Sequence, residues 1–488
     1  MRLQHLLQGL ADCTADTEIN DLSLDSRKIK PGDAFFALSG AHQHGLNYAG
    51  QAIANGASAV IYDPADVDLS KIADMGQVPK AAIPNLDEHL GYIAAKFYGD
   101  PSRHLDVIGI TGTNGKTTCS QLIAQALPDS GVIGTLGWGE TDHLVMTNNT
   151  TPDALTIQQI LKQFLEQKKS VVAMEVSSHG LQQGRVNAVA FKGAVFTNLS
   201  HDHLDYHQSM AEYLQAKLVL FKNPALGFAV VNLDDPYASA VIDTLADHVQ
   251  LWTFSTQGKT VNGAESILAT ESHHSLKGSR FLITWRSHCA QAFTSLAGFF
   301  NIENVLAVEA VLLAMGLPFD LSIARLADLK AITGRMEKFG GVDKPLVFVD
   351  YAHTPDALAK ALNAAKVSGK LWVVFGCGGD RDKAKRREMG KIATTWADQI
   401  IITDDNPRSE PPMSIINDIL AGCQNKNVCV INDRTLAIQA AIQKAAKNDC
   451  VIIAGKGHEN YQEIAGRKLP FSDQEVVKQS LAVWVEMK

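Results

Sequence analysis

The stretch Val107-Ile-Gly-Ile-Thr-Gly-Thr-Asn-Gly-Lys-Thr-Thr118 decides the fold of the middle of this chain. Its first half is mostly apolar, which predicts a buried strand, and apolar residues then recur with helical spacing from Leu122 to Leu127. The turn between them reads Gly-x-x-Gly-Lys-Thr over residues 112–117. It is a shorter variant of the G-x-x-x-x-G-K-[ST] loop, because Ile110 stands where the first glycine belongs. The strand, the glycines, the Lys-Thr pair and the helix all agree, which favours a phosphate-binding loop over an ordinary glycine-rich turn.

Such a loop binds phosphate through its backbone and two side chains. Glycines allow backbone N–H groups to close around phosphate oxygens, and the helix N-terminus adds positive potential. Lys116 would reach the β- and γ-phosphates of a nucleotide, and the Thr117 hydroxyl would hold Mg²⁺.

Composition describes a globular protein of several domains. The chain has 488 residues, which suggests about two to four domains, and its net charge of −8 gives no support to binding of nucleic acid or anionic membranes. Its 7 cysteines form no C-x-x-C pair, so neither a disulfide framework nor a zinc site is indicated. No apolar run has the length of a signal peptide core or a membrane span, which predicts a reducing cytoplasmic location.

Residues 1–86 are expected to form a small α/β domain. Strands are predicted at 19–24, 34–38 and 57–62, with a helix around 48–54, and this close alternation suggests βαβ units. The loop 40–45 offers backbone groups to a ligand, although a solvated turn is the better interpretation for that loop alone. A linker is expected near 84–88.

Residues 87–333 are expected to form the domain that carries the phosphate-binding loop. Strands are predicted at 171–176 and 193–198, and Glu175 and His203 follow strand ends as Lys116 does. Because ligands bind at the carboxyl ends of parallel strands, these residues predict a site for metal ions that bridge nucleotide phosphates. Taken singly, Glu175 is more simply explained as a helix N-cap or surface ion pair, and residues 200–207 as a solvated loop. In the helix 211–221, Lys217 alone would be a surface lysine.

Residues 334–488 show the clearest alternation of strand and helix. Predicted strands at 346–350, 371–376, 399–403, 428–431 and 451–454 indicate a doubly wound sheet. Asp350, Arg381, Arg408 and Glu459 follow strand ends and should line one crevice. The first strand lacks the G-x-G-x-x-G of a dinucleotide site. The alternative, a set of solvated loops, does not explain why glycines and charged residues recur at every strand end.

Six motifs together resemble the Mur ligases, the ATP-dependent amide-forming enzymes of peptidoglycan synthesis. The resemblance covers essentially the whole chain, and within the family it is strongest to the ligases that add the third residue of the stem peptide. The form Asp405-Asn-Pro-Arg408 is the one associated with meso-diaminopimelate. The motifs are Thr111-Gly-Thr-Asn-Gly-Lys-Thr-Thr118, Met174-Glu-Val-Ser-Ser-His179, Thr197-Asn-Leu-Ser-His-Asp-His-Leu-Asp205, Gly334-Arg-Met-Glu337, Asp350-Tyr-Ala-His-Thr-Pro355 and Gly455-Lys-Gly-His-Glu459.

The resemblance implies three α/β domains with three substrates, namely ATP, UDP-N-acetylmuramoyl-L-alanyl-D-glutamate and meso-diaminopimelate, with Mg²⁺ as cofactor. It implies that Lys116, Glu175, His203 and Lys217 are catalytic, and that Thr117, Glu175, His203 and a carbamylated Lys217 hold Mg²⁺. ATP would be bound by Gly112, Thr113, Asn114, Gly115, Lys116, Thr117, Thr118, Asn301, Arg335 and Asp350. The UDP substrate would be bound by Leu24, Ser26, Ala41, His42, Gln43, Asn149, Thr150, Thr151, Ser177, Gln183 and Arg185. Diaminopimelate would be bound by Arg381, Asp405, Asn406, Pro407, Arg408, Gly455 and Glu459.

The sequence departs from the family pattern at Ala41, His42 and His44, where relatives often carry Asp-Gly in place of His44-Gly45. The rival functions are a folylpolyglutamate synthase, the pentapeptide-forming Mur ligase, and a non-catalytic P-loop switch. The switch would need an N-K-x-D guanine motif, and the Asn-Lys at 425–426 lacks its Asp. A monomer with no nucleic acid partner and no membrane insertion is expected.

Overall fold

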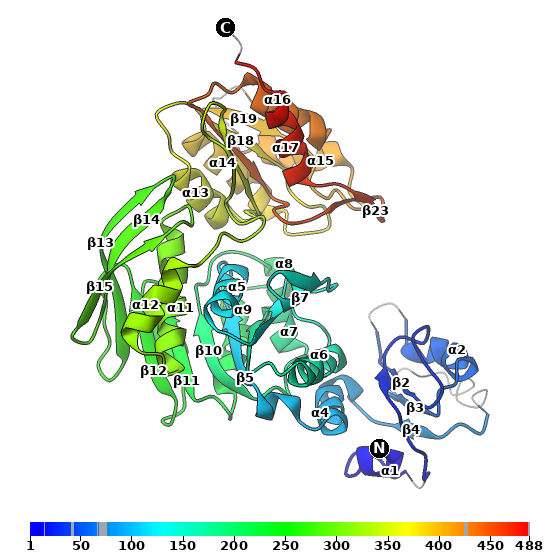
Figure 1. Cartoon of the computed structure of the whole chain (residues 1–488). Coiled ribbons are helices and arrows are strands. Elements are labelled where there is room, and N and C mark those ends of the chain that lie inside the picture. Colours follow the sequence, from blue (N-terminus) through cyan, green and yellow to red (C-terminus); the bar gives the residue numbers. More distant parts are fainter. Residues whose placement is uncertain (14, 41–42, 66, 68–75, 424–427, 487–488) are drawn as a thin grey trace. The chain divides into compact units, whose positions relative to one another are not determined.

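A computed structural model describes residues 1–13, 15–40, 43–65, 67, 76–423 and 428–486 (Figure 1). The chain divides into two compact units. Unit 1 comprises residues 1–109, 129–194 and 219–227, and unit 2 comprises residues 110–128, 195–218 and 228–488. The divisions fall inside β5 (Asp106–Thr111) and β10 (Phe191–Phe196), so each of these strands contributes to both units. Within the described residues, no helix is long and apolar enough to cross a membrane.

Unit 1 begins with a parallel four-stranded sheet in the order β1-β2-β3-β4. This confirms the predicted βαβ pattern, with two differences. Residues 80–82 form a fourth strand that the sequence did not predict, and the helix α4 begins at Leu86, inside the expected linker. The elements are α1 (Leu3–Leu6), β1 (Leu22–Ser23), β2 (Ala34–Ala37), η1 (Gly45–Tyr48), α2 (Ala49–Ala54), β3 (Ala59–Tyr62), β4 (Lys80–Ala82) and α4 (Leu86–Tyr98).

Both faces of this small sheet are covered, because successive residues of its strands point to opposite sides. Phe36 and Ile61 pack with the apolar face of α4, whereas Phe35 and Val60 pack against α2. A strand buried on both faces reads as a continuous apolar run, as Ala34–Ala37 does.

The remainder of unit 1 places β6 beside β9 in parallel and beside β7 in antiparallel orientation. The predicted strand 171–176 is therefore confirmed as β9, which ends at Glu175. The elements are η2 (Pro101–His104), β6 (Ser130–Gly134), β7 (Gly137–Glu140), β8 (His143–Val145), α6 (Ala154–Glu166), β9 (Val171–Glu175), α7 (Ser178–Gln182) and η3 (Val219–Lys222).

Unit 2 contains the helix that follows the glycine-rich loop and a run of five adjacent strands, β11 to β15. The last three, green in Figure 1, form long antiparallel hairpins. The sequence showed only short apolar runs here, because polar residues such as His273 and His274 interrupt β13. The elements are α5 (Lys116–Ala126), α8 (Leu204–His207), α9 (Met210–Leu218), β11 (Phe228–Asn232), α10 (Ala238–Ile242), β12 (Gln250–Ser255), β13 (Glu265–Ser275), β14 (Gly278–Trp285), β15 (His288–Thr294), α11 (Phe300–Ala314) and α12 (Phe319–Ala327).

The C-terminal part of unit 2 is a six-stranded sheet in the order β16-β17-β21-β18-β19-β20, parallel except for β16. The register pairs Asp350 with Ala454 and Phe375 with Ile402, so the predicted strands end at one common edge. The elements are β16 (Glu337–Gly340), β17 (Leu346–Asp350), α13 (Pro355–Ala364), β18 (Leu371–Phe375), α14 (Ala384–Trp396), β19 (Gln399–Ile402), α15 (Pro412–Leu420), β20 (Val428–Val430), α16 (Arg434–Lys444), β21 (Cys450–Ala454), β22 (Tyr461–Ile464), β23 (Arg467–Pro470) and α17 (Asp473–Ala482).

This sheet is doubly wound, as its sequence predicts. Phe348 and Ile452 belong to a core cluster with residues of α13, α14 and α15, whereas their neighbours Val349 and Ile453 pack with α16 and α17. Helices therefore cover both faces, which leaves the loops at the strand ends as the accessible part of the sheet.

Candidate functional site

The loop between β5 and α5 has a conformation that requires its glycines. Gly112 has φ +147°, and a Cβ atom there would lie 1.9 Å from Thr197 Oγ1; Gly115 has φ +89°, and its Cβ would lie 2.6 Å from Asn304 Oδ1. The Thr197 hydroxyl donates to the carbonyl oxygen of Asn114 at 2.6 Å. The loop is thus closely surrounded, and only residues without a side chain fit at these two positions.

The two charged or polar side chains that follow the loop are both engaged. Lys116 Nζ donates to the carbonyl oxygens of Gly112 and Thr113 at 2.8 and 2.9 Å, so the ammonium folds back over the loop. The Thr117 hydroxyl accepts a hydrogen bond of 2.8 Å from Arg335 Nη2. Residue 335, assigned to the nucleotide from the resemblance, therefore reaches the end of the predicted phosphate loop.

Two other residues expected to contact the nucleotide are fixed by backbone groups. Asp350 accepts from the backbone N–H groups of Met336 and Ala352 at 2.7 and 2.8 Å. Burial raises the pKa of its carboxyl group, and Arg335 opposes that effect. Asn301 donates from Nδ2 to the carbonyl oxygen of Ala297 at 2.6 Å.

Lys217 is buried rather than exposed, so the simple interpretation of a surface lysine is wrong. Its side chain is 1% exposed, its Nζ donates to the Gly112 carbonyl oxygen at 2.9 Å, and it lies 4.4 Å from the centroid of the Tyr213 ring. Burial lowers its pKa well below the usual value, the charge of Lys116 lowers it further, and Asp202 opposes both. An amine in this position is readily neutral, and neutral amines are nucleophilic.

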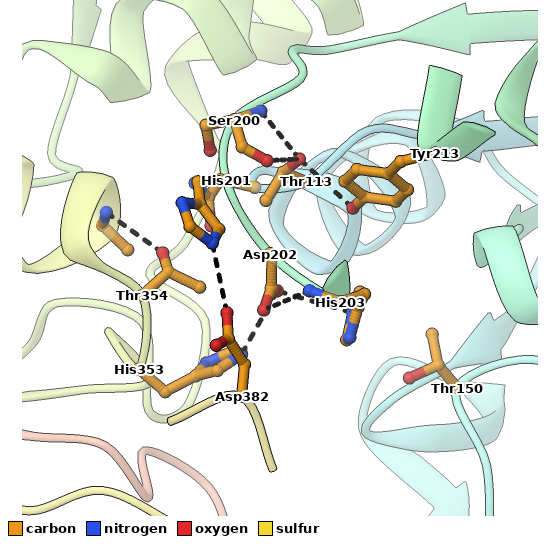
Figure 2. Close-up of polar contacts among 12 residues, drawn as sticks. Thr113, Thr150, Ser200, His201, Asp202, His203, Tyr213, His353, Thr354 and Asp382 are labelled. Carbon is orange, nitrogen blue, oxygen red and sulfur yellow. Dashed lines mark hydrogen bonds and ion pairs between the residues drawn. The ribbon is translucent and has the colours of Figure 1, made fainter. Parts of the chain in front are cut away.

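A carboxylate that the sequence reasoning did not assign, Asp202, lies between two histidines (Figure 2). Its Oδ2 is 3.4 Å from His203 Nε2 and 3.8 Å from His353 Nε2. Burial would raise the pKa of Asp202, but His203, His353 and Lys385 together lower it to about 2. His201 Nε2 lies 3.1 Å from Asp382 Oδ2, and a dashed line marks this contact in Figure 2. Residues 200–207 are therefore not simply a solvated loop.

The strand ends of the C-terminal sheet enclose a cavity of ≈ 210 Å³. Three of the four residues expected in one crevice, Arg381, Arg408 and Glu459, line it. Asp350 is not among the described lining residues, because its carboxylate is directed to the backbone of residues 336 and 352. The lining comprises Asp202, His203, Asp205, Tyr351, His353, Gly376, Cys377, Gly378, Arg381, Asp382, Lys385, Asp405, Asn406, Arg408, Gly455 and Glu459.

A buried lysine organises one side of this cavity. Lys456 is 0% exposed and donates to Asn406 Oδ1 at 2.8 Å and to Glu459 Oε2 at 3.0 Å. Its Nζ also lies 3.8 Å from Asp405 Oδ1. Lys456 has no role among the residues predicted from the sequence, although its place between Gly455 and Glu459 at a strand end is a sufficient signal.

Unit 1 holds the remaining predicted residues, and they form a local network. Glu175 is 0% exposed, which rules out a surface ion pair, and its carboxylate accepts from Thr135 N and Oγ1 at 2.8 and 3.0 Å. Ser177, rather than Glu175, caps the helix α7. The Thr151 hydroxyl donates to the Glu175 carbonyl oxygen at 2.9 Å, and Arg185 Nη1 donates to the Thr151 carbonyl oxygen at 2.7 Å.

The other residues expected to bind the UDP substrate have these positions. Ser26 Oγ donates to Gln51 at 2.7 Å, Gln43 accepts from the Tyr48 hydroxyl at 3.0 Å, and Thr150 bonds Thr135 at 3.0 Å. Ala41 and His42 lie outside the described residues. His44, which departs from the family pattern, accepts from Leu46 N at 3.1 Å and so caps the short helix η1.

The donor set predicted for Mg²⁺ consists of a hydroxyl, a carboxylate, an imidazole and, if Lys217 is carbamylated, a second carboxylate. Mg²⁺ prefers oxygen ligands, so the hydroxyl, the carboxylate and the carbamate fit the ion, whereas the imidazole of His203 offers a nitrogen. Glu175 belongs to unit 1, whereas Thr117, His203 and Lys217 belong to unit 2. Among the residues that the structure describes, no group of three or more His, Cys, Asp or Glu side chains forms a ready metal site.

Comparisons with known proteins identify the family of this chain. Residues 18–98 match the catalytic domain of the Mur ligase family, residues 110–312 the Mur ligase middle domain, and residues 334–457 the Mur ligase glutamate ligase domain. The chain is 45% identical over 494 residues to the UDP-N-acetylmuramoyl-L-alanyl-D-glutamate–2,6-diaminopimelate ligase of Alkalilimnicola ehrlichii, covering 99% of both chains. It is 45% identical over 475 residues to the enzyme of the same name from Coxiella burnetii, covering 96% of both.

Solved structures support the same assignment. A structure of a ligase with that name is 35% identical, with a TM-score of 0.68 over 99% of both chains. MurF from Acinetobacter baumannii shares the fold at 21% identity, with a TM-score of 0.68 over 93% of this chain and 94% of that one. These matches confirm the predicted three-domain α/β fold class, and with the family models they establish that the chain belongs to the Mur ligase family.

Proposed function

We propose that this chain joins meso-2,6-diaminopimelate to UDP-N-acetylmuramoyl-L-alanyl-D-glutamate with consumption of ATP, forming the UDP-N-acetylmuramoyl-tripeptide, ADP and phosphate for peptidoglycan synthesis. Relatives at 42–45% identity over nearly the whole chain carry the name of this ligase. The observation that carries the proposal is the cavity at the C-terminal strand ends, where Arg408, Asn406 and Glu459 offer a cation, an amide and a carboxylate to a small zwitterion.

The first step is phosphoryl transfer to the glutamate carboxylate of the UDP substrate. A carboxylate oxygen attacks the γ-phosphorus, and the bond between that phosphorus and the β-phosphate oxygen breaks. ADP departs, and the substrate carries an acyl phosphate. Gly112 to Thr118 would hold the phosphates, with Lys116 meeting the charge that develops, and Arg335 contacts the same loop through Thr117. Asn301 and Asp350 would complete the nucleotide site.

Mg²⁺ would be held by Thr117, Glu175, His203 and carbamylated Lys217, and when bound it neutralises phosphate charge. Burial lowers the pKa of Lys217, which supports its carbamylation. The nitrogen of a neutral amine forms a bond to the carbon of CO₂ and loses one proton to solvent, and the resulting carbamate carries a negative charge that Mg²⁺ and Lys116 would offset.

The second step is attack of the amino acid. Its amine attacks the carbonyl carbon of the acyl phosphate, and phosphate leaves from the tetrahedral intermediate. Arg408 would bind the distal carboxylate of diaminopimelate and Glu459 the distal ammonium. Asn406, Pro407 and Asp405, with Arg381 and Gly455, would shape the rest of the site.

The UDP substrate would occupy unit 1, along Leu24, Ser26 and residues 41–43, with its dipeptide end near residues 149–151, Ser177, Gln183 and Arg185. We assign the three domains to residues 1–86, 87–333 and 334–488, for the UDP substrate, ATP and the amino acid respectively. We also propose that the protein is a monomer in the cytoplasm.

The test is an amino-acid panel with purified protein, ATP and the UDP-dipeptide. Phosphate release should require both the UDP-dipeptide and meso-diaminopimelate, and lysine should be a poor substitute. Release with folate substrates, or with D-alanyl-D-alanine and a UDP-tripeptide, would assign the chain to a rival ligase of the same fold.

A further inference from the structure

The cavity at the C-terminal strand ends is lined by three lysine or arginine side chains that differ in how they are held. Arg408 donates from Nε to Glu463 Oε2 at 3.2 Å and from Nη1 to the Gly379 carbonyl oxygen at 2.7 Å. Arg381 is exposed and donates to the Asp380 carbonyl oxygen. Lys385 is buried, with 6% of its surface exposed, and no hydrogen bond or ion pair joins its ammonium to any residue that the structure describes.

Lys385 is placed at this cavity by the helix α14, of which it is the second residue. The helix begins directly after the strand-end loop that contains Arg381, and Asp382 Oδ1 accepts from Ala384 N at 2.8 Å at this first turn. Burial and, second, the charge of Lys385 lower the pKa of His353 to about 4, so the ammonium lies within electrostatic range of the Asp202 and His353 side of the cavity.

A buried lysine that makes no hydrogen bond or ion pair costs free energy unless a ligand supplies a direct anionic partner. The charge of Asp202 acts on Lys385, but no hydrogen bond or ion pair joins the two among the described residues, and the Asp202 carboxylate also lies 3.4 and 3.8 Å from two histidines. Asp382 is engaged by His201 and by the backbone of residue 384. The side chain of Lys385 is therefore available to bind an anionic oxygen of a ligand.

Resting on the proposed function, we infer that Lys385 binds the carboxylate beside the reacting amine of the incoming amino acid. Diaminopimelate carries two carboxylates, and a single guanidinium at Arg408 meets only one of them. A second cation is required. Arg381, which the resemblance also assigns to the amino acid, is exposed and donates to the Asp380 carbonyl oxygen, whereas Lys385 is nine-tenths buried and makes no hydrogen bond or ion pair with the described residues. Lys385 thus holds the reacting end of the amino acid, and Arg408 holds the distal end.

Lys385 and Arg408 should contribute to the binding of different compounds. Lysine keeps the carboxylate beside its reacting amine and lacks the distal one, whereas 1,5-diaminopentane lacks both. In the wild-type protein, L-lysine should therefore compete with diaminopimelate at a lower Ki than 1,5-diaminopentane, and equal Ki values would overturn the inference without any variant being needed.

Lys385→Met should raise the KM for diaminopimelate and the Ki of L-lysine by the same factor, about 10- to 100-fold for a lost charge-assisted contact, and leave the Ki of 1,5-diaminopentane unchanged. The KM for ATP should stay within about two- to threefold, and Lys385→Arg should recover part of the loss. Lys391→Met is the matched control, because Lys391 is an exposed lysine of the same helix.

Three results would refute the assignment. One is an unchanged KM for diaminopimelate. Another is an equal loss of 1,5-diaminopentane binding, which indicates general damage to the cavity. The third is a fall in kcat at constant KM for diaminopimelate, which places the contact on the phosphoryl group instead. A wild-type enzyme that does not use diaminopimelate refutes the proposed function itself, and that result is seen before any variant is made.

Discussion

Replacing Arg408 by alanine is the sharpest test of how the amino acid is chosen. The side chain is 20% exposed, and its partners Glu463 and Gly379 hold the guanidinium at the cavity. Nη2 has no hydrogen-bond partner among the described residues, and Nη1 has a second N–H. Nη1 and Nη2 can therefore donate two parallel hydrogen bonds to one carboxylate.

The expected loss follows from that geometry. A hydrogen bond to a charged group contributes about 1.5–3 kcal/mol, and the alanine variant loses the ion pair with the distal carboxylate. The transition-state stabilisation for diaminopimelate should fall by about 2–3 kcal/mol, which lowers kcat/KM roughly 30- to 150-fold. Lysine lacks the distal carboxylate, so its kcat/KM should change little and the preference for diaminopimelate should shrink by that factor.

Initial rates of phosphate release across an amino-acid series measure this effect, with KM for ATP as the internal reference. Arg387→Ala is the matched control, since Arg387 is an exposed arginine outside the cavity lining. A wild-type enzyme that prefers lysine, or an Arg408→Ala enzyme with undiminished discrimination, would contradict the reasoning.

Four further outcomes are expected. Lys217→Ala should lose most activity and regain part of it with added short carboxylic acids. The intact mass of active wild-type protein should include the carbamate, and a mass that corresponds to a bare amine would contradict the prediction. Glu175→Gln, chosen because the side chain is fully buried, should abolish turnover at ordinary Mg²⁺ while the circular dichroism spectrum is retained; near-normal rates would contradict the metal assignment. Lys456→Met removes the cation paired with the half-buried Glu459, whose carboxylate keeps only its hydrogen bond from Asn406 among the described residues. The variant should lose about 3 kcal/mol of unfolding free energy and raise the KM for diaminopimelate at least ~10-fold, as measured by thermal melts and kinetics. Burial raises the pKa of Glu309 to about 7, with its bond to Ser322 opposing, and the unfolded value is near 4.5, so the folded state holds the proton more tightly. Its stabilising contribution is full below pH 4.5 and is lost as pH rises through about 7, by roughly 2–3 kcal/mol. Denaturant titrations should show a flatter pH dependence for Glu309→Gln, and identical curves would refute the assignment.

The local order of the chain was readable from the sequence because short-range physics sets it. Alternating apolar strands and helices over residues 346–454 predicted the doubly wound sheet, and a glycine-rich turn before Lys116 predicted the phosphate loop. Parallel strands end at one edge, so the grouping of Arg381, Arg408 and Glu459 around one cavity followed from the strand boundaries alone.

Other features depend on which surfaces meet, and no local pattern reports that. Lys217 resembles a surface lysine one position from an apolar stripe, and only the packing of α9 against the glycine-rich loop shows that it is buried. The hairpins β13–β15 carry polar residues on their exposed faces, which concealed their length.

The charge balance of the cavity is also a tertiary property. Asp350 follows a strand end like its neighbours, yet the backbone of residues 336 and 352 takes its carboxylate. Lys456 and Lys385 are both buried lysines near the same strand ends. Lys456 is paired with Glu459, whereas Lys385 makes no hydrogen bond or ion pair with the described residues. This difference arises only from the positions of side chains brought together from distant segments. The sequence determined which residues reach this edge, and the folded structure decided which of them are already neutralised, because pairing depends on distances of a few ångströms that the order of residues does not specify.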